Sequence, residues 1–355
     1  MRIGSLVYAT CQGLGYLAKS FYDNGIVTDP VVVEHTTHPN QDWFPDALRV
    51  PIRGLCRDPH HTEIREMLAR CDAVVFFETP FDWTLIDFLR GRKIPTALVT
   101  MHECTPAQIP HPPDQFWCPS LLDYWEFAGW KGIHVPPLPF RCLVENPNVV
   151  FAPVPVSVPW RQRTRVETFV HNAGHGSFRD RNGTAALLAA LPHVTKPCRL
   201  ILRSQRDLES WKQHKRVGVV DVEYLHGTFD YDTLWAEGDA FVFPERFNGI
   251  SLPLQEARAA GMLVIAMDRF PVNTWLPREG LVPAAGYVKA RIGGAYREYD
   301  EAVVEPRAVA TKIDEWVGRD VTAYSLSGAA WAQIMSWPAL GPCYRRLLED
   351  LCNAR

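Results

Sequence analysis

The sequence offers no segment of the kind that crosses a membrane. No apolar run approaches the ~20 residues needed to span a bilayer. Because the chain enters a predicted strand at Arg2, we expect no signal peptide. The nine cysteines are an odd number and form no C-x-x-C pair, so we expect unpaired thiols in a reducing compartment. These absences predict a cytoplasmic protein without stable membrane association, and they leave the oligomeric state unknown.

An excess of positive charge is also missing. Residues 1–150 hold 12 Lys and Arg against 17 Asp and Glu, a net charge of 12 − 17 = −5, and residues 151–355 hold the other 25 and 23, a net charge of +2. This distribution argues against a broad surface for nucleic acid. Arginine and histidine side chains do cluster between Arg49 and Arg70. We interpret them as a solvated loop and helix, with a local nucleic-acid patch as the alternative.

The composition that remains is that of a globular protein with two domains. The chain has 355 residues, of which 47% are hydrophobic and 22% charged, which is long for one core. Predicted strands alternate with helices, and this alternation is typical of α/β architecture with parallel sheets. The run FAPVPVSVP at 151–159 holds three prolines and no charge. It predicts a stiff linker, and thus domains over 1–155 and 156–335.

Several elements can be placed from hydrophobic periodicity. The predicted strands are 3–9, 30–34, 73–77, 95–100, 167–172, 199–204 and 219–225. The predicted helices are 14–24, 63–70, 83–90 and 183–190. We expect an irregular loop over the proline-rich residues 105–119. Near the carboxyl end we expect two helical pieces, broken at Pro338 and again at Gly341-Pro342.

The stretch 243–268 predicts a strand, a loop, a helix and a second strand. Pro253 suits the first helical turn, where its missing N–H would be unpaired in any case, and Gly261 suits the helix end. A helix that starts behind a glycine-containing loop presents free N–H groups and a positive dipole end, which favour a pyrophosphate. Glu256 lies about one turn into this helix, within reach of a sugar hydroxyl.

These residues resemble the donor-site signature of the family 4-like glycosyltransferases with the GT-B fold. The family pattern is roughly E-G-F-G-L-P-x-x-E-A-x-A-x-G-x-P-V-I-A, and this chain reads N-G-I-S-L-P-L-Q-E-A from Asn248 to Ala257, followed by Gly261 and V-I-A at 264–266. The resemblance implies that Glu256 binds the nucleotide ribose. It places Asn248 where the family has a carboxylate that binds the transferred sugar, so the charge of that position is lost here.

The same resemblance extends to the fold and to the phosphate site. It implies two Rossmann-like parallel-sheet domains that face a cleft, an acceptor-binding domain over 1–155 and a donor-binding domain over 156–335. A carboxyl-terminal helix over about 336–355 would cross back to the first domain. The loop that follows the signature's first strand would offer backbone N–H groups to the diphosphate or the sugar, from Gly249, Ile250 and Ser251.

A second loop, between a predicted strand and helix at 171–183, supplies candidate cations. The family commonly has a basic pair here, one residue directly after a glycine and another about six positions later. His175 follows Gly174 and Arg181 lies six residues further on, with Arg179 as a further cation and Ser177 as a further polar contact. Guanidinium groups bind phosphate well and stabilise a leaving diphosphate. His171 and His175 form H-x-x-x-H, but the intervening glycine denies them the helical geometry of a zinc site, so we expect no metal.

The first half carries weaker candidates. Gly13 and Gly15 follow the first strand and would let a ligand approach the backbone, with a plain tight turn as the alternative, because G-x-G-x-x-G is incomplete. His102 and Glu78 each follow a strand, at the edge where open α/β sheets bind ligands. The resemblance implies that His102 touches the transferred sugar, and Glu78 is a candidate for the acceptor pocket. We interpret Asp230-Tyr-Asp232 as a helix cap rather than a metal motif.

We therefore expect an enzyme that moves a hexosyl or related sugar from a nucleotide-diphosphate sugar to an acceptor hydroxyl. The resemblance implies retention of configuration, no obligatory metal, and no cofactor besides the donor substrate. The acceptor is left open as a small molecule, a glycan or a modified DNA base. The alternatives are a glycosyltransferase acting on hydroxymethylated bases in DNA, a non-catalytic sugar-nucleotide-binding protein of the same fold, and an epimerase or phosphorylase that shares it.

Overall fold

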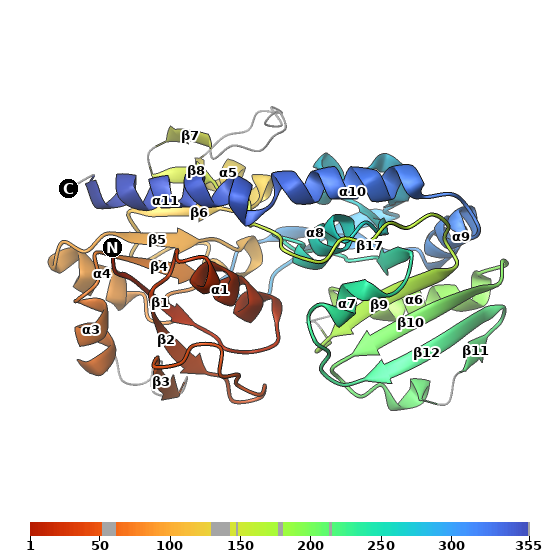
Figure 1. Ribbon diagram of the computed structural model, residues 1–355, viewed down its shortest axis with the longest axis horizontal. Coiled ribbons are helices and arrows are strands. Elements are labelled where there is room, and N and C mark those ends of the chain that lie inside the picture. Colours follow the sequence, from red (N-terminus) through yellow and green to blue (C-terminus); the bar gives the residue numbers. More distant parts are fainter. Residues whose placement is uncertain (52–61, 129–142, 147, 177–179, 213–214, 354–355) are drawn as a thin grey trace. The chain divides into compact units, whose positions relative to one another are not determined.

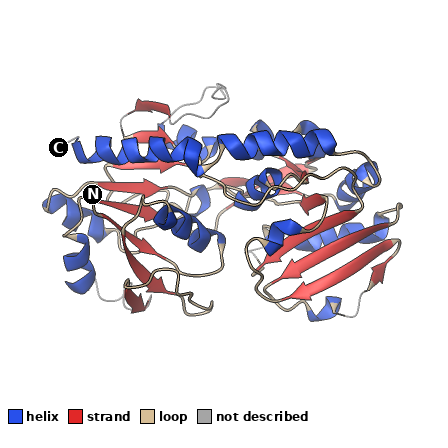
Figure 2. Ribbon diagram, in the orientation of Figure 1, coloured by secondary structure: helices blue, strands red, loops and turns tan. Residues whose placement is uncertain are grey.

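The computed structural model describes residues 1–51, 62–128, 143–146, 148–176, 180–212 and 215–353. The chain divides into two compact units, which are described separately. Unit 1 comprises Met1–Pro155, Gly293–Arg297 and Trp337–Arg355, and unit 2 comprises Val156–Ile292 and Glu298–Ser336. The first division falls inside the proline-rich run 151–159. Each unit is a sheet flanked by helices (Figure 2).

Unit 1 is built on a sheet of eight strands in the order β3-β2-β1-β4-β5-β6-β8-β7 (Figure 1). The strands are β1 (Ile3–Val7), β2 (Asp29–Glu34), β3 (Leu48–Pro51), β4 (Ala73–Phe77), β5 (Thr96–Val99), β6 (Gln115–Cys118), β7 (Leu143–Asn146) and β8 (Val149–Phe151). All neighbours pair in parallel except β7 and β8. Strand β6 corrects our expectation of a loop over 105–119, because its four residues lie in the sheet interior despite the prolines that precede them.

The helices of unit 1 are α1 (Gly13–Asp23), α3 (Thr62–Leu68), α4 (Thr84–Gly91), α5 (Leu121–Ala128) and α11 (Trp337–Asn353), with a short 3₁₀ turn at His102–Cys104. The return of α11 to this unit agrees with the expected crossing helix. The predicted break at Gly341-Pro342 is wrong, since α11 continues through Pro342. The missing backbone bond is offset by burial of one face and by Tyr344, whose hydroxyl donates to the Ala152 carbonyl at 2.9 Å.

Unit 2 contains a second sheet, of seven strands in the order β11-β12-β10-β9-β13-β14-β15. The strands are β9 (Thr168–Gly174), β10 (Cys198–Ser204), β11 (Arg216–Val217), β12 (Val220–His226), β13 (Ala240–Phe243), β14 (Leu263–Asp268) and β15 (Leu281–Pro283). All pair in parallel except β11 with β12. A separate hairpin pairs β16 (Gly286–Ala290) with β17 (Tyr299–Val303).

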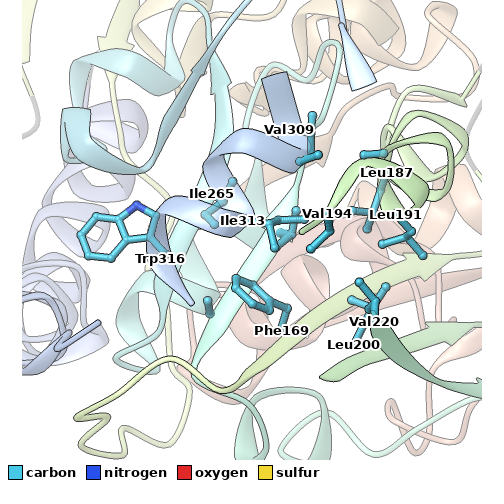
Figure 3. Packing of buried hydrophobic residues seen from close by; sticks show 14 of the residues in the cluster. Phe169, Leu187, Leu191, Val194, Leu200, Val220, Ile265, Val309, Ile313 and Trp316 are labelled. Atoms are coloured by element: carbon cyan, nitrogen blue, oxygen red, sulfur yellow. The ribbon is translucent and has the colours of Figure 1, made fainter. Parts of the chain in front are cut away.

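The helices of unit 2 are α6 (Thr184–Ala190), α7 (Thr233–Ala236), α8 (Leu252–Ala259), α9 (Pro306–Trp316) and α10 (Thr322–Ile334). Successive strand residues serve opposite faces of the sheet. Phe169 packs in a core with α6 and α9 (Figure 3), whereas its neighbour Val170 packs in a second core with Trp235 of α7 and Leu254 of α8. Both faces of the sheet are therefore covered, which explains its nearly continuous apolar strands.

The two sheets are built in a similar way. In unit 1, β2 and β3 extend outwards from β1, and β4 lies on the other side of β1; in unit 2, β10, β12 and β11 extend outwards from β9, and β13 lies on the other side of β9. Such a sheet binds ligands at the carboxyl ends of its strands, where the order reverses. This switch point lies between β1 and β4 in unit 1 and between β9 and β13 in unit 2. Over the part of the chain that the structure describes, no helix combines the length and the hydrophobicity of a membrane span.

Candidate functional site

The loops that follow β9 and β13 meet at the switch point of unit 2. The Arg246 amide donates to the Arg181 carbonyl at 2.7 Å. Gly183 has φ 71°, and a Cβ at this position would come within 2.1 Å of the Pro244 carbonyl oxygen. Only glycine combines this backbone conformation with so close an approach. These contacts hold the two loops together at the edge of the sheet where a ligand is expected.

Arg181 is half-buried in this arrangement. Burial raises the pKa of Glu245, and the positive charge of Arg181 offsets a small part of that rise, so the guanidinium acts on a carboxyl of the opposite loop. His175 is exposed and follows Gly174, which has φ 62°. The candidates Ser177 and Arg179 lie outside the described residues. Of the predicted cations, the structure therefore places Arg181 beside the second loop.

His171 faces the interior instead. Its Nδ1 donates to the Val242 carbonyl at 2.8 Å, and its Nε2 lies 2.8 Å from the Thr184 hydroxyl. Burial lowers the pKa of His171 to about 4, so the ring is neutral. Its role is to tie β9 to β13 and to α6. Within the described residues, no three His, Cys, Asp or Glu side chains are grouped as a metal site.

A buried ion pair organises the loop between β13 and α8. Arg269 follows β14 and lies 2.5 Å from Glu245, and both side chains are at least 98% buried. Ser251 donates from its hydroxyl to Glu245 at 2.8 Å and accepts from Arg269 at 2.9 Å. Arg269 also donates to the Asn248 carbonyl at 3.3 Å. The Arg269 guanidinium therefore contacts the loop near both of its ends, at Glu245 and at Ser251.

Asn248 uses its side chain within the same loop. Its Oδ1 accepts from the amides of Ile250 at 3.1 Å and Ser251 at 3.0 Å. Two of the three amides that we predicted to face a ligand are thus engaged by Asn248 itself. Burial of the Gly249 backbone further encloses the turn. A phosphate that bound these two amides would have to displace the Asn248 carbonyl oxygen.

Helix α8 begins at this turn with an unusual cap. Ser251 is its N-cap residue and has φ 53°, the left-handed region that favours glycine. In the family pattern a glycine stands here. Serine accepts this conformation because its hydroxyl joins the Glu245–Arg269 pair. Pro253 lies in the first turn, as expected.

Glu256 lies on α8 with 4% of its surface exposed. The phenol of Tyr231, from the turn that precedes α7, donates a hydrogen bond to Glu256 Oε1. Burial raises the pKa of Glu256 to about 8, and the Tyr231 hydrogen bond offsets this only in part. Glu256 is thus an enclosed carboxyl, largely protonated at neutral pH, with a hydroxyl already bound to it.

The candidates of unit 1 lie at different depths. Gly13 begins α1 beside open space, whereas a Cβ on Gly15 would lie 2.1 Å from the Thr10 carbonyl oxygen, so only Gly15 is fixed by packing. His102 is buried, 3% exposed, and its Nδ1 lies 4.0 Å from Asp123 of α5. Burial raises the pKa of Asp123 to about 7. The structure therefore places the Asp123 carboxyl beside the His102 ring, and the sequence did not reveal this neighbour.

Two other features have structural explanations. Arg49 pairs with Asp42 at 2.9 Å, and Arg65 lies 5.0 Å from the Phe88 ring centre. These contacts favour the interpretation of a solvated surface, while 52–61, the middle of the basic cluster, lies outside the described residues. Asp232 is the N-cap residue of α7, as expected, but its side chain makes no cap hydrogen bond.

Sequence reasoning missed Glu245, Arg269 and Tyr231. Glu245 and Arg269 each follow the end of a strand by one or two residues, and those strands are neighbours in the sheet. Charged residues at the ends of adjacent parallel strands were the available signal. Tyr231 was overlooked because it lies between the two aspartates that drew attention as a possible metal motif.

Part of the chain matches a known protein family, and the chain as a whole is similar to solved structures. Residues 173–289 match the model of a family described as glycosyl transferases group 1. HepE of Anabaena, solved with UDP and glucose, is 11% identical, with coverage of 99% of this chain and 100% of that one and a TM-score of 0.65. Sucrose-phosphate synthase of Thermosynechococcus elongatus is 14% identical, with full coverage of both chains and a TM-score of 0.60. The chain has no significant match among curated protein sequences.

A further similar structure is the pneumococcal O-GlcNAc transferase GtfA in complex with UDP and GlcNAc. It is 14% identical, with coverage of 79% of this chain and 57% of that chain and a TM-score of 0.53. These similarities confirm the predicted GT-B fold, with two sheets of mostly parallel strands flanked by helices. The matched segment 173–289 contains both loops of the unit 2 switch point.

Proposed function

We propose that the protein is a glycosyltransferase that moves a sugar from a nucleotide-diphosphate sugar to an acceptor hydroxyl. The observation that carries this proposal is the meeting of two loops at the β9–β13 switch point. It brings together Arg181, the start of α8 and the loop that leads to Glu256, all within the segment that matches the family model. Unit 2 would bind the donor and unit 1 the acceptor.

Arg181 is the group we assign to the diphosphate. A guanidinium binds phosphate oxygens in pairs and stabilises the negative charge that builds on the leaving group. The start of α8 would add the dipole and the amides of Ile250 and Ser251. These amides become available when the Asn248 side chain turns away, so donor binding is expected to rearrange Asn248. His175, on the exposed side of the same loop, is a further contact, and we keep Ser177 and Arg179 as candidates.

Glu256 is the group we assign to the ribose. A ribose hydroxyl would take the place of the Tyr231 phenol, so the carboxyl would exchange one hydroxyl donor for another. Burial raises the pKa of Glu256 to about 8, so the neutral form of the carboxyl is favoured in the unliganded protein. This suits a site that recognises a neutral diol.

The chemistry that follows is transfer with retention. The acceptor oxygen would attack from the face that the diphosphate leaves, and the departing phosphate would take the acceptor proton. Such a route needs no pair of carboxylates of the glycosidase type and no obligatory metal ion. His102 would contact the transferred sugar, with the Asp123 carboxyl 4.0 Å from its Nδ1.

UDP-glucose is the first donor to test, because the similar protein HepE has been solved with UDP and glucose and with UDP-glucose. The experiment measures UDP release from UDP-glucose, with GDP-mannose, ADP-glucose and UDP-GlcNAc as further donors. Arg181→Ala and Glu256→Gln should each lower turnover by about 100-fold or more, by loss of transition-state and binding contacts. Arg199→Ala is the matched control, since Arg199 is exposed at the opposite end of β10. Near-normal turnover in both site variants would refute the assignment.

A further inference from the structure

Four aromatic rings form a continuous row at the carboxyl end of the unit 1 sheet. The Tyr8 ring lies 5.2 Å from His35 and 5.1 Å from Phe81, both edge to face, and His35 lies 4.6 Å from His38. We call these four residues the ring row. All four side chains are partly exposed. Rings that pack against one another and still reach solvent leave an amphipathic surface open to a ligand.

The ring row lies at the switch point of its sheet. Tyr8 follows β1, His35 and His38 follow β2, and Phe81 follows β4, and these three strands are neighbours in the order β2-β1-β4. The strand order reverses between β1 and β4, where open α/β sheets bind ligands. The ring row therefore lies at the switch point of the unit 1 sheet, and Arg181 lies at the switch point of the unit 2 sheet.

The loop that carries Phe81 holds backbone strain. Glu78 has φ 65° and Phe81 has φ 59°, although neither is glycine. Local hydrogen bonds fix both, from the Glu78 amide to the Val99 carbonyl at 2.8 Å and from the Phe81 amide to the Thr79 hydroxyl at 3.1 Å. Residues other than glycine that are held in this region are strained, and they concentrate at ligand sites. The strained backbone therefore lowers the stability of the fold, and it fixes where the Phe81 ring and the Glu78 carboxylate lie.

The loop that carries the two histidines is equally fixed. The His35 backbone amide donates to Asn40 Oδ1 at 3.0 Å, and Asn40 Nδ2 donates to the His35 carbonyl at 3.3 Å. The Gln41 amide then donates to the Ala9 carbonyl at 2.6 Å, which joins this loop to the one after β1. His35 Nδ1 accepts from the Thr37 amide at 3.2 Å, so the ring proton is on Nε2. The row is preorganised rather than formed on binding.

We propose that the ring row stacks the sugar ring of a carbohydrate acceptor. A pyranose has an apolar face of C–H groups and a rim of hydroxyls. The row would meet it with aromatic rings and with polar atoms at their edges, namely the Tyr8 hydroxyl, His35 Nε2 and the His38 ring. The carboxylate of Glu78, three residues before Phe81, adds an acceptor for hydroxyls. This proposal rests on the proposed glycosyltransferase function and names its acceptor as a glycan.

The test measures binding of cellobiose, maltose and lactose to the full-length protein by saturation-transfer NMR and calorimetry. At least one disaccharide should bind, and Tyr8→Leu and Phe81→Leu should weaken it by about three- to tenfold, the contribution of an aromatic contact. If either leucine variant fails to fold, His38→Ala takes its place. This change lies at the partly exposed end of the row and should weaken binding by a similar factor. Phe88→Leu is the matched control, because Phe88 is a half-buried ring of α4 beside Arg65 and Arg92.

Donor turnover is followed in the same proteins. Release of UDP from UDP-glucose in water reports on the donor site of each protein, and transfer to the bound disaccharide should fall with its affinity in the ring-row variants. Donor turnover without binding of any of the three disaccharides, or with equal binding by wild type and all ring-row variants, overturns the glycan proposal. Absence of donor turnover together with ring-dependent disaccharide binding would instead overturn the proposed transferase function and leave a glycan site.

Discussion

The phenol of Tyr231 donates a hydrogen bond to the buried carboxyl of Glu256. The two residues are 25 positions apart, one before α7 and the other on α8. Despite this bond, burial raises the pKa of Glu256 to about 8 from an ordinary value of 4.5. The unliganded protein therefore keeps a protonated acid and a hydroxyl in the place that we assign to a ribose.

The first prediction concerns how stability varies with pH. A carboxyl whose pKa is higher in the folded state binds its proton more tightly when folded. Its contribution is therefore complete below pH 4.5 and is lost as the pH rises towards 8. Relative to Glu256→Gln, the wild type should lose about 1.4 kcal/mol of unfolding free energy for each pH unit in this window. Urea denaturation of both proteins from pH 5 to 8 measures this difference. Parallel stability curves would show that Glu256 is not buried in this way.

The second prediction separates strain from hydrogen bonding at Ser251. Alanine at 251 keeps the strained φ of 53° and removes the hydroxyl that contacts Glu245 and Arg269, whereas glycine removes the same hydroxyl and relieves the strain. Ser251→Ala should therefore be less stable than Ser251→Gly by about 1 kcal/mol. Thermal denaturation of the two variants side by side is the measurement. Equal midpoints, or a less stable glycine variant, would argue against a left-handed cap.

The third prediction concerns the Glu245–Arg269 pair. Arg269→Met leaves Glu245 buried without its cation, at a cost of about 3–5 kcal/mol. The loss should grow with pH, because burial already raises the pKa of Glu245 and removal of Arg269 raises it further. Adding Glu245→Gln should recover part of the stability, since no buried charge then lacks its partner. A double variant as unstable as Arg269→Met at pH 8 would indicate that Arg269 acts through its backbone contacts alone.

Much of unit 2 was predictable, because its strands are short apolar runs and its helices have clear ends. The segment from β13 through α8 to β14 follows from Pro253, Gly261 and the apolar run between 263 and 267. Strand β6 was not predictable, since its four residues follow a stretch rich in proline and gain their order from β5 and β8 on either side. The continuation of α11 through Pro342 likewise depends on tertiary packing, which outweighs local propensity.

The candidate site was predictable only where a residue belongs to a local sequence pattern. Arg181 and Glu256 could be named from sequence patterns and a family resemblance. The Arg269–Glu245 pair joins the loops that follow β14 and β13, and the Tyr231–Glu256 bond joins the turn before α7 to α8; no local pattern reports such pairings. The use of Asn248 to hold two amides of its own loop also depends on side-chain geometry that spacing does not reveal.

Calorimetric titration of UDP into the wild type, Arg181→Ala, Glu256→Gln and the Arg199→Ala control bears most directly on the donor site. We predict that the wild type and the control bind UDP with equal affinity. Arg181→Ala should lose about tenfold or more, the equivalent of one charge-assisted contact of at least about 1.4 kcal/mol, and Glu256→Gln should also bind more weakly, with thermal unfolding showing all four proteins folded. Equal binding by all four proteins, or no binding of UDP, GDP or ADP by the wild type, would contradict a nucleotide-sugar site at the β9–β13 switch point.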